Sequence, residues 1–441
     1  MDSVLSWWLA EDTRGYQNAQ RIAALMATLI GIQVLKLLSP DFEAISYTEF
    51  GIDVMVEETS TGDTGKYLFW ISMFAAALMM TIRRPMSFAK NLSEQLPLVW
   101  LVGIGVVSFI WALAPFISFK RSVMQLILVF TLFATVTYLR DPRQIFLIFY
   151  RLSIVLLLLN LLSIPIGVGF DVNGNFRGAM SHKNLFGQNA VLALYFGLAV
   201  LWFYKSRVNR MVWMGYMTLW LVLLLLSMSK TSIALLLLVP MLLIVANFVA
   251  HLFRMNLGVV IASFVAACFM FVAIGTAWFG VSIKPFLQMF VDDVSLTGRD
   301  FIWAFVLEEV SQRWFSGHGL GSFWGIGFNS PNVKYGEGFV VHIHQSHNGY
   351  IDLLAQLGVV GMALYLAMLA QMSAHLGKIE SNAPRLFFIC WLIVLFSLTN
   401  NITESSIFRG IHGVWVIQLI MIAIASRVYL DSKRRVDVHI N

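Results

Sequence analysis

The chain has 441 residues, of which 59% are hydrophobic and only 12% charged, and its mean hydropathy is +0.77. A soluble domain usually carries about 25% charged residues, so this chain has too few to cover the surface of a soluble protein of its size. These figures exclude a soluble enzyme, a disordered protein and a nucleic-acid-binding protein. They predict a chain that is solvated mainly by lipid. The formal net charge of +6 is less informative than the positions of the positive residues.

Twelve apolar runs along the chain are candidates for transmembrane helices, because a helix needs roughly 20 apolar residues to cross about 30 Å of hydrocarbon. They cover residues 20–38, 67–82, 96–114, 122–139, 144–164, 184–204, 211–228, 230–250, 257–280, 348–373, 385–403 and 407–427. The sequence therefore predicts an all-α, polytopic integral membrane protein with about 12 transmembrane helices.

The lysines and arginines alternate between successive connections in the way that the positive-inside rule requires. With the N-terminus in the cytoplasm, most of the 30 fall on the inner side, including those in 83–84, 140–143 and 205–210. Residues 39–66 then form an acidic outer loop, to which we assign no role. Both termini are predicted to be cytoplasmic.

The chain divides into three parts by this pattern, without a separate soluble domain. Residues 1–164 contain the first five helices, residues 165–427 contain the remaining helices, and residues 428–441 form a basic cytoplasmic tail. One connection, 281–347, is long and rich in aromatic residues, which argues for ordered structure. Within it, residues 298–314 predict a helix that lies on the membrane surface or caps the bundle.

Three histidines lie close together near the end of this connection, and a zinc site is the first reading to consider. His342, His344 and His347 could converge on a metal ion. However, the segment has no nearby cysteine or clear carboxylate ligand to complete the set. We therefore expect no metal and no other cofactor.

Polar motifs mark four places where a predicted helix begins at the outer face. They are 181–184, 229–232, 297–300 and 345–348. In the third, Thr297 is expected to cap the helix and Asp300 to close a capping box. A helix start presents free N–H groups and the positive end of its dipole, so four starts with a cation or an imidazole predict an anion-binding floor. Pyrophosphate fits such a floor, because Arg299 can bind it in a bidentate manner.

Each of these residues also has a simpler interpretation. Lys230 could be an anchor that snorkels to the membrane surface. Arg299 could form a structural ion pair with Asp300 or Asp293, and His347 could only cap a helix. Ionisable groups at a membrane edge are costly, however, and their joint placement on one face favours a binding site.

Five motifs, in order along the chain, resemble those of a known family. They are Ser181-His182-Lys183-Asn184, Ser229-Lys230-Thr231-Ser232, Thr297-Gly298-Arg299 with Trp303, the glycine-rich stretch from Gly317 to Trp324, and Ser346-His347-Asn348-Gly349-Tyr350. Over roughly residues 165–400 the chain resembles the O-antigen ligase/polymerase family, and within it the exopolysaccharide-production polymerase subgroup.

The resemblance implies a lipid-sugar glycosyltransferase fold in the bacterial inner membrane, with its active site facing the periplasm. It implies a glycan on polyprenyl pyrophosphate as donor, and transfer with inversion and without metal. Arg299 would bind the pyrophosphate and His347 would act at the acceptor hydroxyl. Lys230 departs from the arginine that is common at its position in ligases. Further candidates are Lys230, Arg177 and Lys183 for the pyrophosphate, and His182, Asn184, His344, Asn348, Tyr350 and Trp324 for the glycan.

Three functions remain open from the sequence. A polymerase adds the growing chain to another lipid-linked repeat unit, a ligase moves it to lipid A–core, and a transporter or flippase only moves it. The subgroup resemblance favours the polymerase. Expected partners are the lipid bilayer, the polyprenyl-pyrophosphate-linked oligosaccharide, and proteins that regulate chain length or export the polysaccharide; nucleic acid is not among them.

Overall fold

The computed structural model describes residues 13–41, 64–279 and 298–440. Within these ranges the secondary structure is helical, apart from an isolated β-bridge between Phe170 and Phe176. In the same ranges, seven helices are long and apolar enough to cross a membrane, or eight if one bent pair counts as a single span. The predicted all-α, polytopic membrane protein is therefore confirmed.

Each of the twelve predicted runs coincides with a helix. The seven long apolar helices are α3 (Thr64–Arg83), α6 (Pro115–Tyr138), α7 (Gln144–Ile166), α8 (Lys183–Phe203), α10 (Lys230–Phe253), α15 (Gly349–Ile379) and α17 (Gly413–Ile440). The others are α2 (Thr13–Val34), α5 (Leu96–Val107), α9 (Arg210–Leu226), α11 (Leu257–Phe279) and α16 (Pro384–Asn400). The sequence did not predict α4 (Pro85–Ser93), which is bent by 90° from α5. A proline lies in the first turn of both α4 and α5, a position that suits a new helix start.

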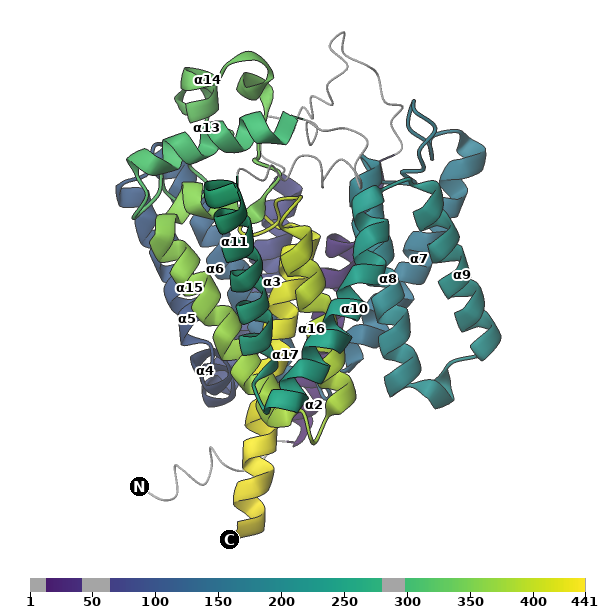
Figure 1. The fold of residues 1–441 in the computed structure, drawn as a ribbon. Helices are drawn as coiled ribbons and strands as arrows, with labels where there is room; N and C mark the ends of the chain where they lie inside the picture. Colours follow the sequence, from purple (N-terminus) through teal and green to yellow (C-terminus); the bar gives the residue numbers. More distant parts are fainter. Residues whose placement is uncertain (1–12, 42–63, 280–297, 441) are drawn as a thin grey trace, which may run out of the picture.

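The basic connections gather at one end of the bundle, where α17 also ends (Figure 1). Two contacts join them: the Tyr138 hydroxyl donates to the Arg84 carbonyl at 2.7 Å, and Arg385 Nη1 donates to the Trp202 carbonyl at 3.0 Å. The helices α13 (Arg299–Gln312) and α14 (Pro331–Tyr335) lie at the opposite end. The folded helices therefore alternate as the charge pattern predicts.

The boundaries of α17 differ from the prediction. It begins at Gly413 rather than at 407, and it continues as a helix to Ile440, through the predicted tail 428–441. Its middle is held by buried polar contacts, since Gln418 accepts from Ser397 Oγ at 2.8 Å and donates to the Tyr365 hydroxyl at 2.9 Å. Such bonds link α15, α16 and α17 through side chains that are fully buried. Residues 401–412, which were expected to be largely helical, instead form a loop.

The helix predicted at 298–314 is α13, and it caps the bundle. Ile302, Val306 and Val310 face inward, and α13 packs on α15. Gly298, with φ of +80°, occupies the N-cap position, so the prediction of Thr297 as the cap is wrong; Thr297 itself lies outside the described residues. A glycine there adopts a positive φ without steric cost.

The helix α15 is broken at Gly358, where φ is +60°. The carbonyls of Ala355 and Gln356 accept from the backbone N–H groups of His318 and Gly319, each at 2.9 Å. The glycine-rich turn after α13 therefore satisfies the backbone groups that the break leaves free. The outer part of α15 thus ends at a fixed point, and its N-terminus carries the candidate site.

Candidate active site

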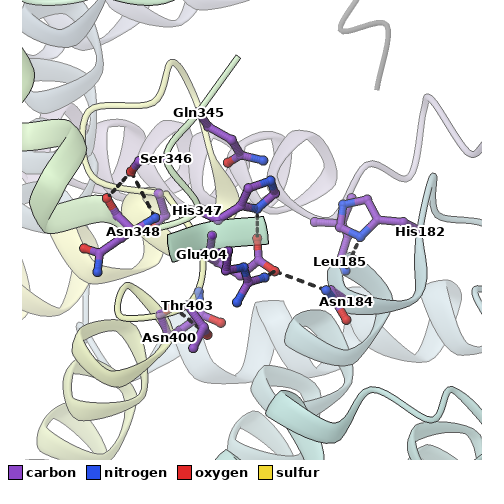
Figure 2. A network of polar contacts seen from close by, with 12 residues as sticks. His182, Asn184, Leu185, Gln345, Ser346, His347, Asn348, Asn400, Thr403 and Glu404 are labelled. Atoms are coloured by element: carbon purple, nitrogen blue, oxygen red, sulfur yellow. Dashed lines mark hydrogen bonds and ion pairs between the residues drawn. The ribbon is translucent and has the colours of Figure 1, made fainter. Parts of the chain in front are cut away.

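The carboxylate of Glu404 lies at the centre of a polar network (Figure 2), at the end of the bundle that α13 caps. Its Oε1 lies 3.5 Å from Arg299 Nη2 and accepts a hydrogen bond from Asn184 Nδ2 at 3.1 Å. Its Oε2 lies 3.5 Å from His347 Nδ1. Three segments that are far apart in the sequence therefore converge on one side chain.

Glu404 is 8% exposed, yet it is held in its charged form. Burial alone would raise the pKa of its carboxyl, but the hydrogen bond and charge of His347, together with Arg299 and His182, outweigh it and lower the pKa to about 2. The carboxylate is therefore ionised at neutral pH, and it balances part of a cationic surface.

The loop that carries Glu404 is fixed by its own asparagines. The Glu404 backbone N–H donates to the Asn400 carbonyl at 2.9 Å. Asn401 Oδ1 accepts from the Ser406 N–H at 2.9 Å, and Asn401 Nδ2 donates to the Ser397 carbonyl at 2.7 Å. These bonds replace helical ones, which explains why the apolar residues after 403 do not continue as a membrane helix.

His347 occupies a strained position directly before α15. Its φ is +52°, a left-handed conformation that costs a non-glycine residue about 1–3 kcal/mol. The next residue, Asn348, caps the helix through Oδ1, which accepts from the N–H groups of Tyr350 at 3.0 Å and Ile351 at 3.2 Å. The Gly349 N–H then donates to the carbonyls of Asn401 and Glu404. The strained turn is therefore held directly against the Glu404 loop.

The structure brings the four predicted helix starts together. Asn184 in the first turn of α8, Arg299 at the start of α13 and His347 before α15 all contact Glu404. The start of α10 joins them because Ser229 Oγ donates to Asn184 Oδ1 at 3.2 Å. Gly187 permits this approach, since a Cβ there would come within 2.7 Å of the Ser232 side chain.

The candidate pyrophosphate ligands differ in their surroundings. Lys183 is partly buried as the first residue of α8, and Lys230 is exposed as the first residue of α10. Arg177 is 1% exposed, and its Nη1 donates to the Met180 carbonyl at 2.9 Å and lies 3.5 Å from Asp41 Oδ1. These contacts hold the loop that carries Arg177 and do not reach Glu404.

Two of the glycan candidates face the network. His182 caps α8, because its Nδ1 accepts from the Leu185 N–H at 3.2 Å, and its charge helps to lower the pKa of Glu404. Asn348 Nδ2 donates to the Ile402 carbonyl at 3.2 Å.

Other glycan candidates are engaged inside the protein. The Tyr350 hydroxyl donates to the Leu398 carbonyl at 2.8 Å. Trp324 is 8% exposed, and its Nε1 donates to Asp352 Oδ1 at 2.8 Å. His344 is partly buried.

Glu404 and the nearby basic residues Arg409 and Lys36 were not predicted from the sequence. Arg409 contacts Gln345 Oε1, next to the His347 turn. Burial, then Arg409 and Lys36, lower the pKa of His412 to about 3. An acidic residue between two apolar runs at the outer membrane edge was the available signal, since such residues default to a functional hypothesis.

The arrangement combines a buried carboxylate, cations, helix N-termini and one imidazole. Cations and helix starts bind anions, and a neutral imidazole can accept a proton. In the described part of the chain, no group of three or more His, Cys, Asp or Glu side chains is placed to hold a metal ion.

The chain is similar to known proteins in its second half. The sequence model of the O-antigen ligase family matches residues 216–366, which include Arg299 and His347. A provisionally named polysaccharide ligase of Rickettsia conorii is 23% identical over 150 residues, 31% of this chain and 34% of that protein. Another, of Rickettsia felis, is 24% identical over 144 residues, 31% of this chain and 35% of that protein.

These alignments span about a third of the length of the two relatives, and Asn184 and Glu404 lie outside the region that the family model covers. Four of the five motifs on which the resemblance rests lie within that region, and Ser181-His182-Lys183-Asn184 lies before it. Over residues 216–366 the chain is therefore similar to the O-antigen ligase family.

Proposed function

We propose that the protein is a polysaccharide polymerase of the bacterial inner membrane, with cytoplasmic termini and its active site in the periplasm. It transfers a glycan from polyprenyl pyrophosphate to a sugar hydroxyl of another lipid-linked repeat unit, with inversion and without metal. The observation that carries this proposal is the meeting of Arg299 and His347 on opposite oxygens of Glu404. One cation and one base are thereby held side by side at the outer end of the bundle.

In this reaction the bond between the sugar carbon and the phosphate oxygen breaks, and the pyrophosphate leaves with the electron pair. Arg299 and the nearby helix starts stabilise that developing charge. Lys183 and Lys230 stand at two of those starts and add positive charge there. Arg177 stabilises the loop before α8, because its guanidinium is already bonded to the Met180 carbonyl and paired with Asp41.

The acceptor hydroxyl is a poor nucleophile until it loses its proton. We assign His347 as the base that takes this proton as the new glycosidic bond forms, a role that typically contributes about 10²–10⁴-fold to the rate. His182, Asn184 and Asn348 lie close enough to the network to bind sugar hydroxyls. Trp324 and Tyr350 support the site from within, because each is hydrogen-bonded to the protein interior.

A ligase that transfers the glycan to lipid A–core is the alternative for the same site, because it uses the same donor. The subgroup resemblance of the Ser346–Tyr350 motif favours the polymerase. A transporter would need no base beside the anion site, so the pairing of His347 with Arg299 argues against it. Chain-length regulators and export proteins are the expected protein partners.

The test is a reaction with purified protein, polyprenyl-pyrophosphate-linked repeat units and a metal chelator. We expect a ladder of longer lipid-linked glycans, which His347→Ala abolishes. His251→Ala, at the opposite end of the bundle, is the matched control and should leave the ladder intact. Transfer that occurs only after lipid A–core is added would identify a ligase, and a ladder with His347→Ala would overturn the assignment of the base.

A further inference from the structure

We propose that Glu404 is the positioning residue of the reaction: it orients His347 as the base and releases Arg299 to the incoming pyrophosphate. This inference rests on the proposed glycosyl transfer and deepens it. No motif from the sequence analysis includes Glu404, and it lies beyond the region 216–366 that the family model matches. Its assignment therefore depends on the geometry of the folded chain.

The two oxygens of Glu404 have separate partners (Figure 2). Oε1 is shared between Arg299 Nη2 and Asn184 Nδ2, whereas Oε2 lies next to His347 Nδ1. The side chain of Glu404 is 11% exposed, so water screens these contacts weakly. Removal of Arg299 would leave Oε1 bonded to Asn184 and Oε2 beside His347. The carboxylate can thus lose one partner and keep its position.

This geometry selects one form of the imidazole. Glu404 Oε2 lies 3.5 Å from His347 Nδ1, and an ionised carboxylate only accepts hydrogen bonds, so it favours the form of the ring in which Nδ1 carries a proton. In the neutral ring, Nε2 is then the unprotonated nitrogen and is able to receive the acceptor proton. The strained φ of His347 and the Asn348 cap fix the backbone on which the ring is mounted. Glu404 therefore sets which nitrogen acts.

The pairing with Arg299 couples this base to the donor. A pyrophosphate offers more negative charge than one carboxylate and matches the guanidinium in a bidentate manner, so it competes for Arg299. Once Arg299 binds the donor, its positive charge no longer offsets the negative charge of Glu404, which then acts more strongly on His347. The imidazolium that forms during transfer is then stabilised more strongly, and the base becomes effective only when the donor is bound.

Every proton and electron pair in the transfer step has a donor and an acceptor. The acceptor proton moves to His347 Nε2, the acceptor oxygen bonds to the sugar carbon, and the carbon–phosphate-oxygen bond breaks with its electron pair on the pyrophosphate. Glu404 stays ionised throughout, in keeping with its pKa of about 2. The imidazolium returns its proton to water after the products separate.

The experiment compares the purified full chain with Glu404→Gln, Glu404→Asp and a matched control, Thr403→Val. Thr403 is the neighbouring loop residue, and its hydroxyl makes only a long 3.4 Å bond to the Asn400 carbonyl among the described residues. Three quantities are measured: the rate of lipid-linked glycan extension, its dependence on pH, and binding of polyprenyl pyrophosphate. Thermal unfolding in detergent verifies that each variant is folded.

For Glu404→Gln we expect extension to fall by about 10²–10⁴-fold, the usual contribution of general-base catalysis, while polyprenyl pyrophosphate binds as tightly as to the unaltered protein or more tightly. The acidic limb of the pH–rate profile should move to lower pH, because the base loses the carboxylate that stabilises its protonated form. The other charged or titratable groups around the carboxylate all remain in the variant. They are Arg299, His182, His412, Arg409 and Lys36. Glu404→Asp keeps the charge and should retain more activity than Glu404→Gln.

Two outcomes would overturn the inference. One is a Glu404→Gln protein with an unchanged pH–rate profile, whatever its rate, since a merely structural role alters yield or stability but not the profile. The other is weaker binding of polyprenyl pyrophosphate to Glu404→Gln, since the carboxylate would then assist the donor site. If the unaltered protein extends no lipid-linked glycan, the proposed function itself fails, which is a separate result.

Discussion

Trp324 and Asp352 are joined by a hydrogen bond of 2.8 Å between the indole Nε1 and the carboxylate Oδ1. The same oxygen accepts from the backbone N–H of Ser346 at 3.1 Å, directly before His347. Asp352 is 4% exposed and lies in the first turn of α15. One buried carboxylate therefore ties the glycine-rich turn to the turn that presents the candidate base.

The first prediction concerns this bond. Trp324→Phe keeps an aromatic ring but removes the N–H, so the protein should lose about 1.5–3 kcal/mol of stability, the contribution of a hydrogen bond to a charged group. Thermal unfolding in detergent measures the change. If stability is unaltered while the KM for the acceptor rises, Trp324 contacts the glycan directly, as the sequence analysis expected.

The second prediction concerns the close contact between the His347 turn and the Glu404 loop. A Cβ on Gly349 would come within 2.9 Å of Asn401 Cγ, so Gly349→Ala must push the two segments apart. We expect extension of lipid-linked glycan to fall by about 10²-fold, because displacements near 1 Å in an active site have effects of that size. Gly215→Ala is the control, since its Cβ would meet nothing within 4 Å. Equal activity of both variants would contradict the prediction.

The third prediction separates charge from geometry at Arg299. Arg299→Lys keeps the charge but loses the planar guanidinium, so donor binding should weaken and turnover should fall. Arg299→Gln should be more damaging, because it also leaves the buried Glu404 without its cation. Titration with polyprenyl pyrophosphate and the extension assay measure both effects. A fully active Arg299→Lys enzyme would mean that only charge matters at this position.

The fourth prediction concerns pH and the residue just before α17. Burial and nearby cations lower the pKa of His412 from its ordinary 6.5 to about 3, so the folded protein favours the neutral ring. This contribution to stability is complete above pH 6.5 and is lost as the pH falls toward about 3, because the unfolded chain takes up the proton first. Thermal unfolding should therefore shift to lower temperature on acidification. In His412→Asn, whose side chain can also accept from the Val414 N–H as His412 Nδ1 does at 3.4 Å, the shift should be smaller; an equal shift would assign the acid sensitivity to another group.

Much of the fold follows directly from local properties of the sequence. Hydropathy alone located the helices that coincide with the twelve apolar runs, because an apolar run of such length must be shielded from water. The distribution of lysine and arginine predicted which connections share an end. The polar motifs at 181–184, 229–232 and 345–348 marked helix starts, since caps are local features of one turn.

The remaining features depended on contacts between distant segments. The break of α15 at Gly358 requires the turn near His318, which lies earlier in the chain and whose backbone N–H groups donate to the α15 carbonyls. The apolar runs 385–403 and 407–427 extended into both ends of the loop 401–412, but the side chain of Asn401 bonds the Ser397 carbonyl and the Ser406 N–H and holds the segment outside a helix. Glu404 therefore had no motif to mark it.

By itself, the sequence determined the membrane class, the apolar helices, which basic connections share an end of the bundle, and the two candidate residues Arg299 and His347. Only the tertiary structure decided that these two meet on Glu404, that Trp324 and Arg177 are turned inward, and that four helix starts share one face. The physical reason is that hydropathy and helix capping act over a few residues. An ion pair instead depends on the folded path that brings its partners within a few ångströms.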